Sequence, residues 1–222
     1  MKIAKEAWPF VLPTLVLAAV AAFLESWLVS ALLLALAVAF LFFFRDPARS
    51  WDGPEEIVLA AADGVITAIE PFEDENVGGE ILRIVTFLSV FNVHVQRCPV
   101  EGEVVHSSHR SGRKVAAFDR EAGEINESHL TVIRRAEGDL IGTRQIVGLI
   151  ARRIVPYLKP GDRVSRGQHF GVIKFGSRVD LLLPASYEPL VKVGDKIRCG
   201  ETPVAMPTDP SSHPISDSGD QE

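Results

Sequence analysis

Cysteine is scarce in this sequence, and an excess of basic charge is absent. Cys98 and Cys199 are the two cysteines among 222 residues, and neither has the CxxC or Cys/His spacing of a metal site. We therefore expect two free thiols in a reducing compartment, and no metal.

The formal net charge is −6. Segment 208–222 holds four carboxylates and no Lys or Arg, so the rest of the chain carries −2. This nearly neutral body excludes a generic nucleic-acid-binding protein.

Two apolar runs, at 8–24 and 27–44, occupy the amino-terminal part of the chain. Each is near the lower length limit for a helix that crosses a bilayer. Residues 1–46 are therefore expected to form a hydrophobic helical hairpin that anchors the protein to the cell (inner) membrane. Basic residues precede the first run and follow the second, so the positive-inside rule places both ends, and the domain that follows, on the cytoplasmic face. They are Lys2, Lys5, Arg45 and Arg49.

Two other interpretations of these runs stay open. A re-entrant pair of helices would dip into one leaflet, and Glu25 at the turn would not then have to cross the bilayer. A cleaved signal peptide would use the lysines as its basic region and residues 19–21 as its exit site. The signal peptide leaves the second apolar run unexplained.

The segment 47–207 consists of short β-branched runs divided by Gly, Pro and Asp. This pattern predicts a mainly β domain, an antiparallel barrel or sandwich. The motif K-x-G-D-x-V/I-x-x-G occurs at 159–167 and again at 192–200. Such a repeat indicates two similar hairpin units packed against each other, as in lipoyl and biotinyl carriers. Residues 208–222, rich in Ser, Pro and Asp, are expected to be a disordered acidic tail.

Gly176-Ser177 lies between two predicted strands, 170–175 and 178–183. One interpretation is an ordinary two-residue hairpin with glycine at positive φ. The other is a self-cleavage site, in which the Ser177 hydroxyl attacks the Gly176 carbonyl. Glycine leaves that carbonyl open to approach, but a serine hydroxyl needs a base to become an effective nucleophile.

A candidate base and a candidate carboxylate are found elsewhere in the chain. His94 is polar among apolar residues in Val93-His94-Val95, although a core or solvent-facing histidine would look the same. Asp63 lies between two predicted strands, where it could equally be part of a plain Asp-Gly turn. His106 and His109 are three residues apart, which in a strand puts them on opposite faces and argues against a metal pair.

Taken in order, several motifs resemble one family across residues 48–205. They are Ala61-Ala62-Asp63-Gly64, Phe91-Asn92-Val93-His94, Gly102-Glu103-Val104, Arg134-Arg135, a basic loop before Ile125-Asn126-Glu127, Gln145-Ile146-Val147-Gly148, Lys159–Gly167 and Phe175-Gly176-Ser177. With these motifs the chain resembles the short archaeal and bacterial class (type A) of phosphatidylserine decarboxylases, which depend on a pyruvoyl group.

The resemblance implies that Asp63, His94 and Ser177 form a self-processing triad. Cleavage between Gly176 and Ser177 would give a large chain, 1–176, and a small chain, 177–222, that remain together as a heterodimer and assemble into a higher oligomer. Ser177 would become a covalent pyruvoyl group, whose ketone accepts electrons during decarboxylation in place of pyridoxal phosphate. The substrate would be phosphatidylserine, a membrane lipid, and the product phosphatidylethanolamine. Arg110, Arg113 and Lys114 could meet its phosphate, or they could be an ordinary solvated loop.

One residue departs from the family pattern: Phe91 stands where larger relatives commonly have a second histidine. The role of His94 in decarboxylation itself is therefore less defined than its role in processing.

Two other classes of protein stay open. A membrane-anchored carrier would need a modifiable lysine at the hairpin tip, but Lys174 lies back in the strand. A pyruvoyl enzyme for a soluble amino acid would have no use for the apolar amino terminus.

Overall fold

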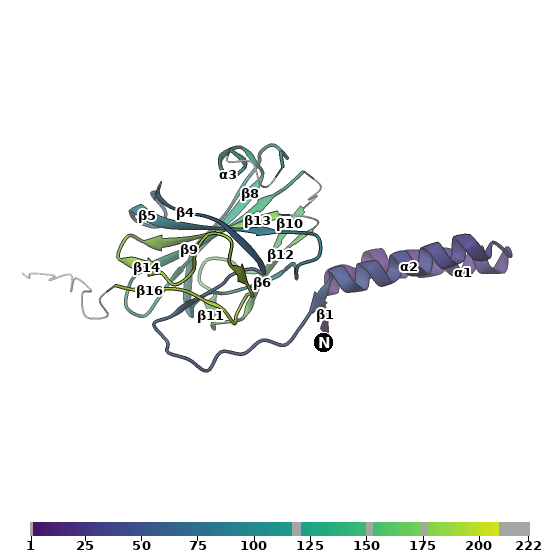
Figure 1. Ribbon diagram of the computed structural model, residues 1–222, viewed down its shortest axis with the longest axis horizontal. Coiled ribbons are helices and arrows are strands. Elements are labelled where there is room, and N and C mark those ends of the chain that lie inside the picture. The colour runs from purple at the N-terminus through teal and green to yellow at the C-terminus, as the bar shows by residue number, and fades with distance from the viewer. Residues whose placement is uncertain (1, 117–120, 150–152, 175–176, 209–222) are drawn as a thin grey trace, which may run out of the picture.

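The computed structural model describes residues 2–116, 121–149, 153–174 and 177–208. A helical hairpin projects from one side of a β domain (Figure 1). Its elements are the 3-10 turn η1 (Lys5–Ala7), α1 (Trp8–Phe23) and α2 (Trp27–Phe43). The short strands β1 (Lys2–Ile3) and β2 (Arg45–Asp46) pair with each other and hold the two ends of the hairpin together. Gly176 and the expected tail beyond residue 208 lie outside the described residues.

The two helices pack against each other through small side chains. Ala18, Ala21 and Ala37 are buried, and the Ser30 hydroxyl donates a 3.0 Å hydrogen bond to the Ala18 carbonyl. Small residues allow close approach of helices whose outer faces are apolar. The stretch Lys5–Phe23 is long and apolar enough to cross a membrane, with a mean hydropathy of 1.7. The 17 residues of α2 rise about 26 Å, short of a hydrocarbon core of about 30 Å.

The base of the hairpin packs directly on the β domain. Phe43 and Phe44, at the end of α2, share one buried apolar cluster with Val93, Val95 and Val172. Buried ion pairs fix the segment that follows: the Arg97 guanidinium lies 2.6 Å from Asp46, and Arg49 lies 3.0 Å from Asp63. The hairpin is therefore attached to the β domain by packing as well as by the chain.

The strands of the β domain are short, apart from those at its centre. They are β3 (Val58–Leu59), β4 (Gly64–Asp74), β5 (Gly79–Leu88), β6 (Val95–Arg97), β7 (Gly102–Arg110), β8 (Ser128–Arg134), β9 (Leu140–Val147), β10 (Arg153–Pro156), β11 (Arg163–Val164), β12 (His169–Lys174), β13 (Ser177–Pro184), β14 (Tyr187–Pro189), β15 (Lys196–Ile197) and β16 (Pro203–Pro207), with one short helix, α3 (Ala122–Ile125), between β7 and β8.

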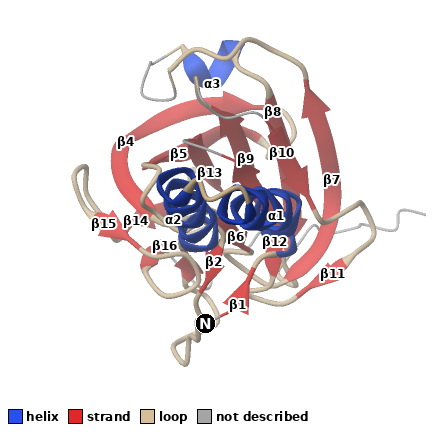
Figure 2. Ribbon diagram, turned by 90° about the vertical axis from the view of Figure 1, so that its right-hand side faces the viewer, coloured by secondary structure: helices blue, strands red, loops and turns tan. Residues whose placement is uncertain are grey.

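Eight of these strands form one curled antiparallel sheet, in the order β11-β7-β8-β9-β13-β5-β4-β15. Figure 2 shows this sheet curving around the core as a half-barrel. Two three-stranded sheets, β10-β12-β6 and β14-β16-β3, complete the domain. The mainly β, barrel-like fold with two hydrophobic amino-terminal helices, predicted from the sequence, is confirmed.

The repeated motif forms the two outer strands of the large sheet. β11 lies in the first copy and β15 in the second, at opposite edges. Both copies open with the same turn, in which an aspartate carboxylate accepts a 3.0 Å hydrogen bond from the backbone N–H of the motif's lysine. The copies meet at their last glycines, because a Cβ on Gly200 would lie 3.8 Å from the Gly167 Cα. The two copies are thus in contact at the glycines that follow the edge strands.

We predict that Gly102→Ala destabilises the fold much more than Gly138→Ala, although both glycines have positive φ, of 150° and 94°. A Cβ on Gly102 would lie 2.2 Å from the Arg134 carbonyl oxygen of the neighbouring strand, whereas nothing lies within 4 Å of one on Gly138. We expect a loss of about 3 kcal/mol at Gly102 and about 1 kcal/mol at Gly138. Thermal unfolding in detergent measures both, and equal shifts in Tm would contradict the prediction.

Candidate active site

Ser177 begins β13, a central strand of the large sheet. It pairs with Leu88 of β5 on one side and with Val147 of β9 on the other. Side chains alternate along a strand, so Ser177 shares the inner face with Val179 and Leu181, which belong to the main core. Its side chain is fully buried, and Oγ has no hydrogen-bond partner among the described residues. A buried hydroxyl without a partner costs about 1–3 kcal/mol, which makes this position a candidate for a functional role.

His94 lies immediately before β6 and is also fully buried. Its Nδ1 lies 2.9 Å from the Asn92 carbonyl oxygen. A carbonyl can only accept, so Nδ1 carries the proton and Nε2 keeps its lone pair. Nε2 has no partner among the described residues. The ring stacks on Phe43 at the end of α2, with ring centroids 4.1 Å apart. The imidazole is thus held in the tautomer that a general base requires.

Strand register brings His94 and Ser177 to the same end of the domain. Val95 pairs with Val172 of β12, so His94 lies beside the end of that strand, which stops at Lys174. Ser177 opens the next strand. Both residues therefore lie at this end of the domain, although 83 residues (177 − 94) separate them in sequence.

Burial lowers the pKa of His94 to about 4, chiefly because the charged ring would be desolvated. The positive charge of Arg45 lowers the pKa further, while the Asn92 carbonyl opposes both effects. The imidazole is consequently neutral at pH 7 and able to accept a proton. A donor at Ser177 would meet a base that is already in the right protonation state.

Asp63 is buried, but its contacts differ from those of a simple triad. One carboxylate oxygen accepts a 2.8 Å hydrogen bond from the Cys199 backbone N–H, and the other lies 3.0 Å from Arg49 Nη2. The contact with His94 Nδ1 expected of Asp63 is made by the Asn92 carbonyl. Arg45 acts electrostatically on both His94 and Asp63. Asp63 thus belongs to a charge cluster with Arg49 and Arg45, and its link to the imidazole runs through Arg45.

The basic loop is partly used inside the protein. Arg110 donates hydrogen bonds to the carbonyls of Gly123 and Asn126, at 2.8 and 3.3 Å. Lys114 Nζ lies 3.5 Å from the Glu127 carboxylate, and the side chain of Arg113 is exposed. The Glu127 carbonyl accepts a hydrogen bond from the N–H of Val147, the residue of β9 that pairs with Ser177. The loop therefore borders the site, with Arg110 bracing it.

A pair of buried glutamines joins the two sheets behind the site. Gln145 of β9 donates a 2.9 Å hydrogen bond from Nε2 to Oε1 of Gln96 in β6. The remaining Gln96 Nε2 and Gln145 Oε1 have no partners among the described residues. Phe43 could not have been found from the sequence, because it reaches His94 from a distant segment, and the Asn92 carbonyl could not because a backbone group has no sequence signal. Gln145 lies in a motif that the sequence did single out.

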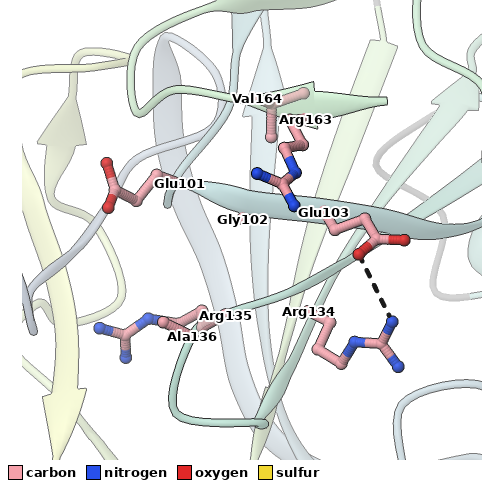
Figure 3. Close-up of a pocket in the computed structure, with 8 residues that line it drawn as sticks. All are labelled: Glu101, Gly102, Glu103, Arg134, Arg135, Ala136, Arg163 and Val164. Carbon is pink, nitrogen blue, oxygen red and sulfur yellow. Dashed lines mark ion pairs between the residues drawn. The ribbon is translucent and has the colours of Figure 1, made fainter. Parts of the chain in front are cut away.

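An open cavity lies in another part of the domain. A hollow of about 430 Å³ is lined by charged residues of β7, β8 and β11 and their connections, with Glu103 and Arg134 facing each other across it (Figure 3). Ser128, at the start of β8, pairs with Ile146 beside Ser177's partner Val147, whereas Arg134 ends that strand. Ser128 and Arg134 are six residues apart along β8, and an extended strand rises about 3.3 Å per residue, so the hollow lies about 20 Å from Ser177. It is not the site built around His94 and Ser177.

Comparison with known proteins gives consistent matches. A family model described as phosphatidylserine decarboxylase matches residues 36–205. A "phosphatidylserine decarboxylase proenzyme" of Symbiobacterium thermophilum is 41% identical over 201 residues, covering 90% of this chain and 93% of that protein. Proteins with the same name from Geobacter sulfurreducens and Nitrosomonas eutropha are 42% and 41% identical, covering 90% and 91% of this chain and 94% of each relative.

We predict that His94 titrates near pH 4 in the folded, uncleaved variant Ser177→Ala. Because the pKa of the unfolded imidazole is about 6.5, the unfolded chain binds the proton first. The contribution of the neutral His94 ring to the free energy of unfolding is therefore fully present above about pH 6.5, and it is lost as the pH drops towards 4. Histidine Cε1–H NMR signals, assigned with His94→Gln, measure the titration. A His94 pKa between 6 and 7 would show that the ring is not buried as described.

Proposed function

The chain belongs to the phosphatidylserine decarboxylase family and is a decarboxylase, and we propose that it converts phosphatidylserine to phosphatidylethanolamine with a pyruvoyl group made from its own Ser177. The observation that carries the proposal is that Ser177 Oγ and His94 Nε2, at one end of the β domain, are buried and have no hydrogen-bond partner within the part of the chain that the structure describes. Membership of a decarboxylase family decides against the carrier or adaptor alternative.

Processing begins with proton transfer from the Ser177 hydroxyl to His94 Nε2. Oγ attacks the Gly176 carbonyl carbon, the C–N bond breaks, and an ester with a free Ser177 amine results. His94 returns the proton to that amine as the bond breaks. Loss of the Ser177 α-proton then expels the Gly176 carboxylate and leaves a dehydroalanine end. One water replaces its nitrogen as ammonia, which leaves the ketone.

Asp63 is proposed to act through charge rather than by a direct hydrogen bond to the ring. Protonation of His94 places a positive charge near the guanidinium of Arg45. The Asp63 carboxylate, held by Arg49 and the Cys199 N–H, offsets that charge and stabilises the imidazolium.

The sheet gives a physical reason for the two chains to stay together. The small chain, 177–222, would begin with β13, which pairs along its length with β5 and β9 of the large chain, 1–176. Cleavage before the first residue of β13 breaks none of these pairs. We therefore propose a heterodimer of the two chains, and a higher oligomer built from it.

Once present, the pyruvoyl ketone supplies an electron sink for the electrons released with carbon dioxide. The residues of this chain position the lipid and move protons around that group. His94 Nε2 is the free nitrogen placed to return a proton to the product. Arg113 and Lys114 are proposed to meet the phosphate, with Arg110 holding their loop. The amino-terminal helices would hold the site at the cytoplasmic face of the inner membrane, where the lipid lies.

Intact mass spectrometry tests the processing step. We expect the wild-type chain to appear as 1–176 and a 46-residue remainder (222 − 176) that is lighter by one ammonia than a fragment beginning with free Ser177. Ser177→Ala and His94→Ala should stay whole, because each removes one of the two reacting groups. A wild-type chain that stays whole after reconstitution in a membrane refutes the pyruvoyl proposal.

The charge of Asp63 can be tested separately with Asp63→Asn. The amide oxygen can still accept from the Cys199 N–H, so the change removes charge with little change of shape. We expect processing to slow by at least tenfold, the equivalent of about 1.4 kcal/mol in the barrier. Glu201→Gln is the matched control, since Glu201 also pairs with Arg49 but is more exposed. Processing of Asp63→Asn at the wild-type rate would remove Asp63 from the mechanism and leave Ser177 and His94 in it.

A further inference from the structure

Large apolar side chains are exposed on the two loops that leave the strands beside Ser177. β5 ends at Leu88, which pairs with Ser177, and the turn that follows exposes Val90 by 40% and Phe91 by 74%. β9 ends at Val147, which pairs with Ser177 from the other side, and Leu149 just beyond it is 68% exposed. We call Val90, Phe91 and Leu149 the apolar rim.

The first of these loops is a rigid turn. The Asn92 side-chain oxygen accepts hydrogen bonds from both the N–H and the hydroxyl of Ser89, each at 2.8 Å, and the Asn92 N–H donates to the Ser89 carbonyl at 3.0 Å. Val90 and Phe91 are the two residues held at its tip. A fixed turn that presents two large apolar side chains to solvent gains nothing in folding, and exposed apolar patches mark interaction surfaces.

The apolar rim is continuous with the base of the helical hairpin. Arg45 donates a 2.6 Å hydrogen bond to the Phe91 carbonyl, and its guanidinium lies over the Phe42 ring of α2 at 4.0 Å. On the other side, Lys174 at the end of β12 lies over the Phe10 ring of α1 at 5.2 Å. Arginine and lysine beside apolar side chains are typical of the level at which a helix leaves the hydrocarbon region.

We propose that the apolar rim inserts into the surface of the bilayer in which the hairpin is anchored, so that Ser177 faces the lipid headgroups. This proposal rests on the proposed function, because a lipid substrate gives the site a reason to face the membrane. The occupant is the bilayer surface rather than a protein, since the rim continues directly from helices whose own outer faces are apolar and exposed. The headgroup then reaches the site without leaving the membrane.

A fluorescence measurement tests the position of the rim without using lipid turnover. The introduced cysteines Phe91→Cys, Leu149→Cys and Ala136→Cys are each labelled with a thiol-reactive NBD dye. The native thiols, Cys98 and Cys199, are buried and their pKa values are raised by that burial, so they react slowly. Ala136 is the matched control, because it is exposed in the turn at the opposite end of β9, eight residues or about 26 Å away.

Each labelled full-length protein is reconstituted into vesicles of phosphatidylcholine and phosphatidylglycerol with a spin-labelled phosphatidylcholine. We expect quenching of the dye at positions 91 and 149 and little at 136. Equal quenching at all three positions, or none at 91 and 149, would overturn the proposal. A cooperative thermal unfolding transition in detergent, with a Tm close to that of the wild type, shows that each variant has folded.

An activity ratio gives a second test. Phe91→Ser and Leu149→Ser should lower carbon dioxide release from vesicle phosphatidylserine by about tenfold, in line with the loss of one apolar anchor. Release from short-chain phosphatidylserine dissolved as monomers should change little. An equal loss on both substrates contradicts insertion. If no variant or wild-type protein decarboxylates either lipid while the quenching pattern holds, the proposed function fails and the membrane-facing rim stands.

Discussion

The pairing of β13 on both of its edges is the constraint on which the site depends. A strand with a neighbour on each side and the core on one face has no solvent along its length, so Ser177 at its first position is buried as well. The same pairing fixes where the neighbouring strands end, and hence where the loops carrying Phe91 and Leu149 emerge. It also allows a chain cut before Ser177 to keep every pair of the sheet. The position of Ser177, the loops around it and the ability of the sheet to stay paired after a cut all follow from the pairing of β13.

His94 lies at the junction between the β domain and the helical hairpin. The turn that orients the ring through the Asn92 carbonyl is the turn that exposes Phe91, and the ring itself stacks on Phe43 of α2. Displacement of the hairpin would therefore disturb the imidazole before it disturbed the sheet. The hairpin thus helps to position the His94 ring. This explains why an apolar hairpin is packed on the domain rather than joined by a free linker.

The sequence predicted more of the fold than of the contacts within the site. The short β-branched runs and the apolar amino terminus identified the mainly β domain and its helices, and the repeated motif proved to form both edge strands. The motifs also selected His94 and Ser177, which the fold brings to one end. The Asn92 carbonyl and Phe43 could not be predicted, because backbone groups carry no sequence signal and Phe43 is one of many phenylalanines in an apolar run. Asp63 was found by its motif, but its contacts with Arg49 and Cys199 depend on tertiary packing.

The dryness of the site bears on the fate of the ester in the proposed processing. Water attacking the ester would regenerate an ordinary amino-terminal serine, whereas elimination leads to the ketone. Both reactions begin from the same species, so the outcome depends on how much water reaches it. Ser177 and His94 are fully buried, which disfavours the hydrolytic branch. Burial costs about 1–3 kcal/mol for each unpaired polar atom in the folded chain. In the proposed processing, the same burial protects the ester from hydrolysis. Water is needed only after the chain has been cut, when two new ends at residues 176 and 177 are free to separate and admit it.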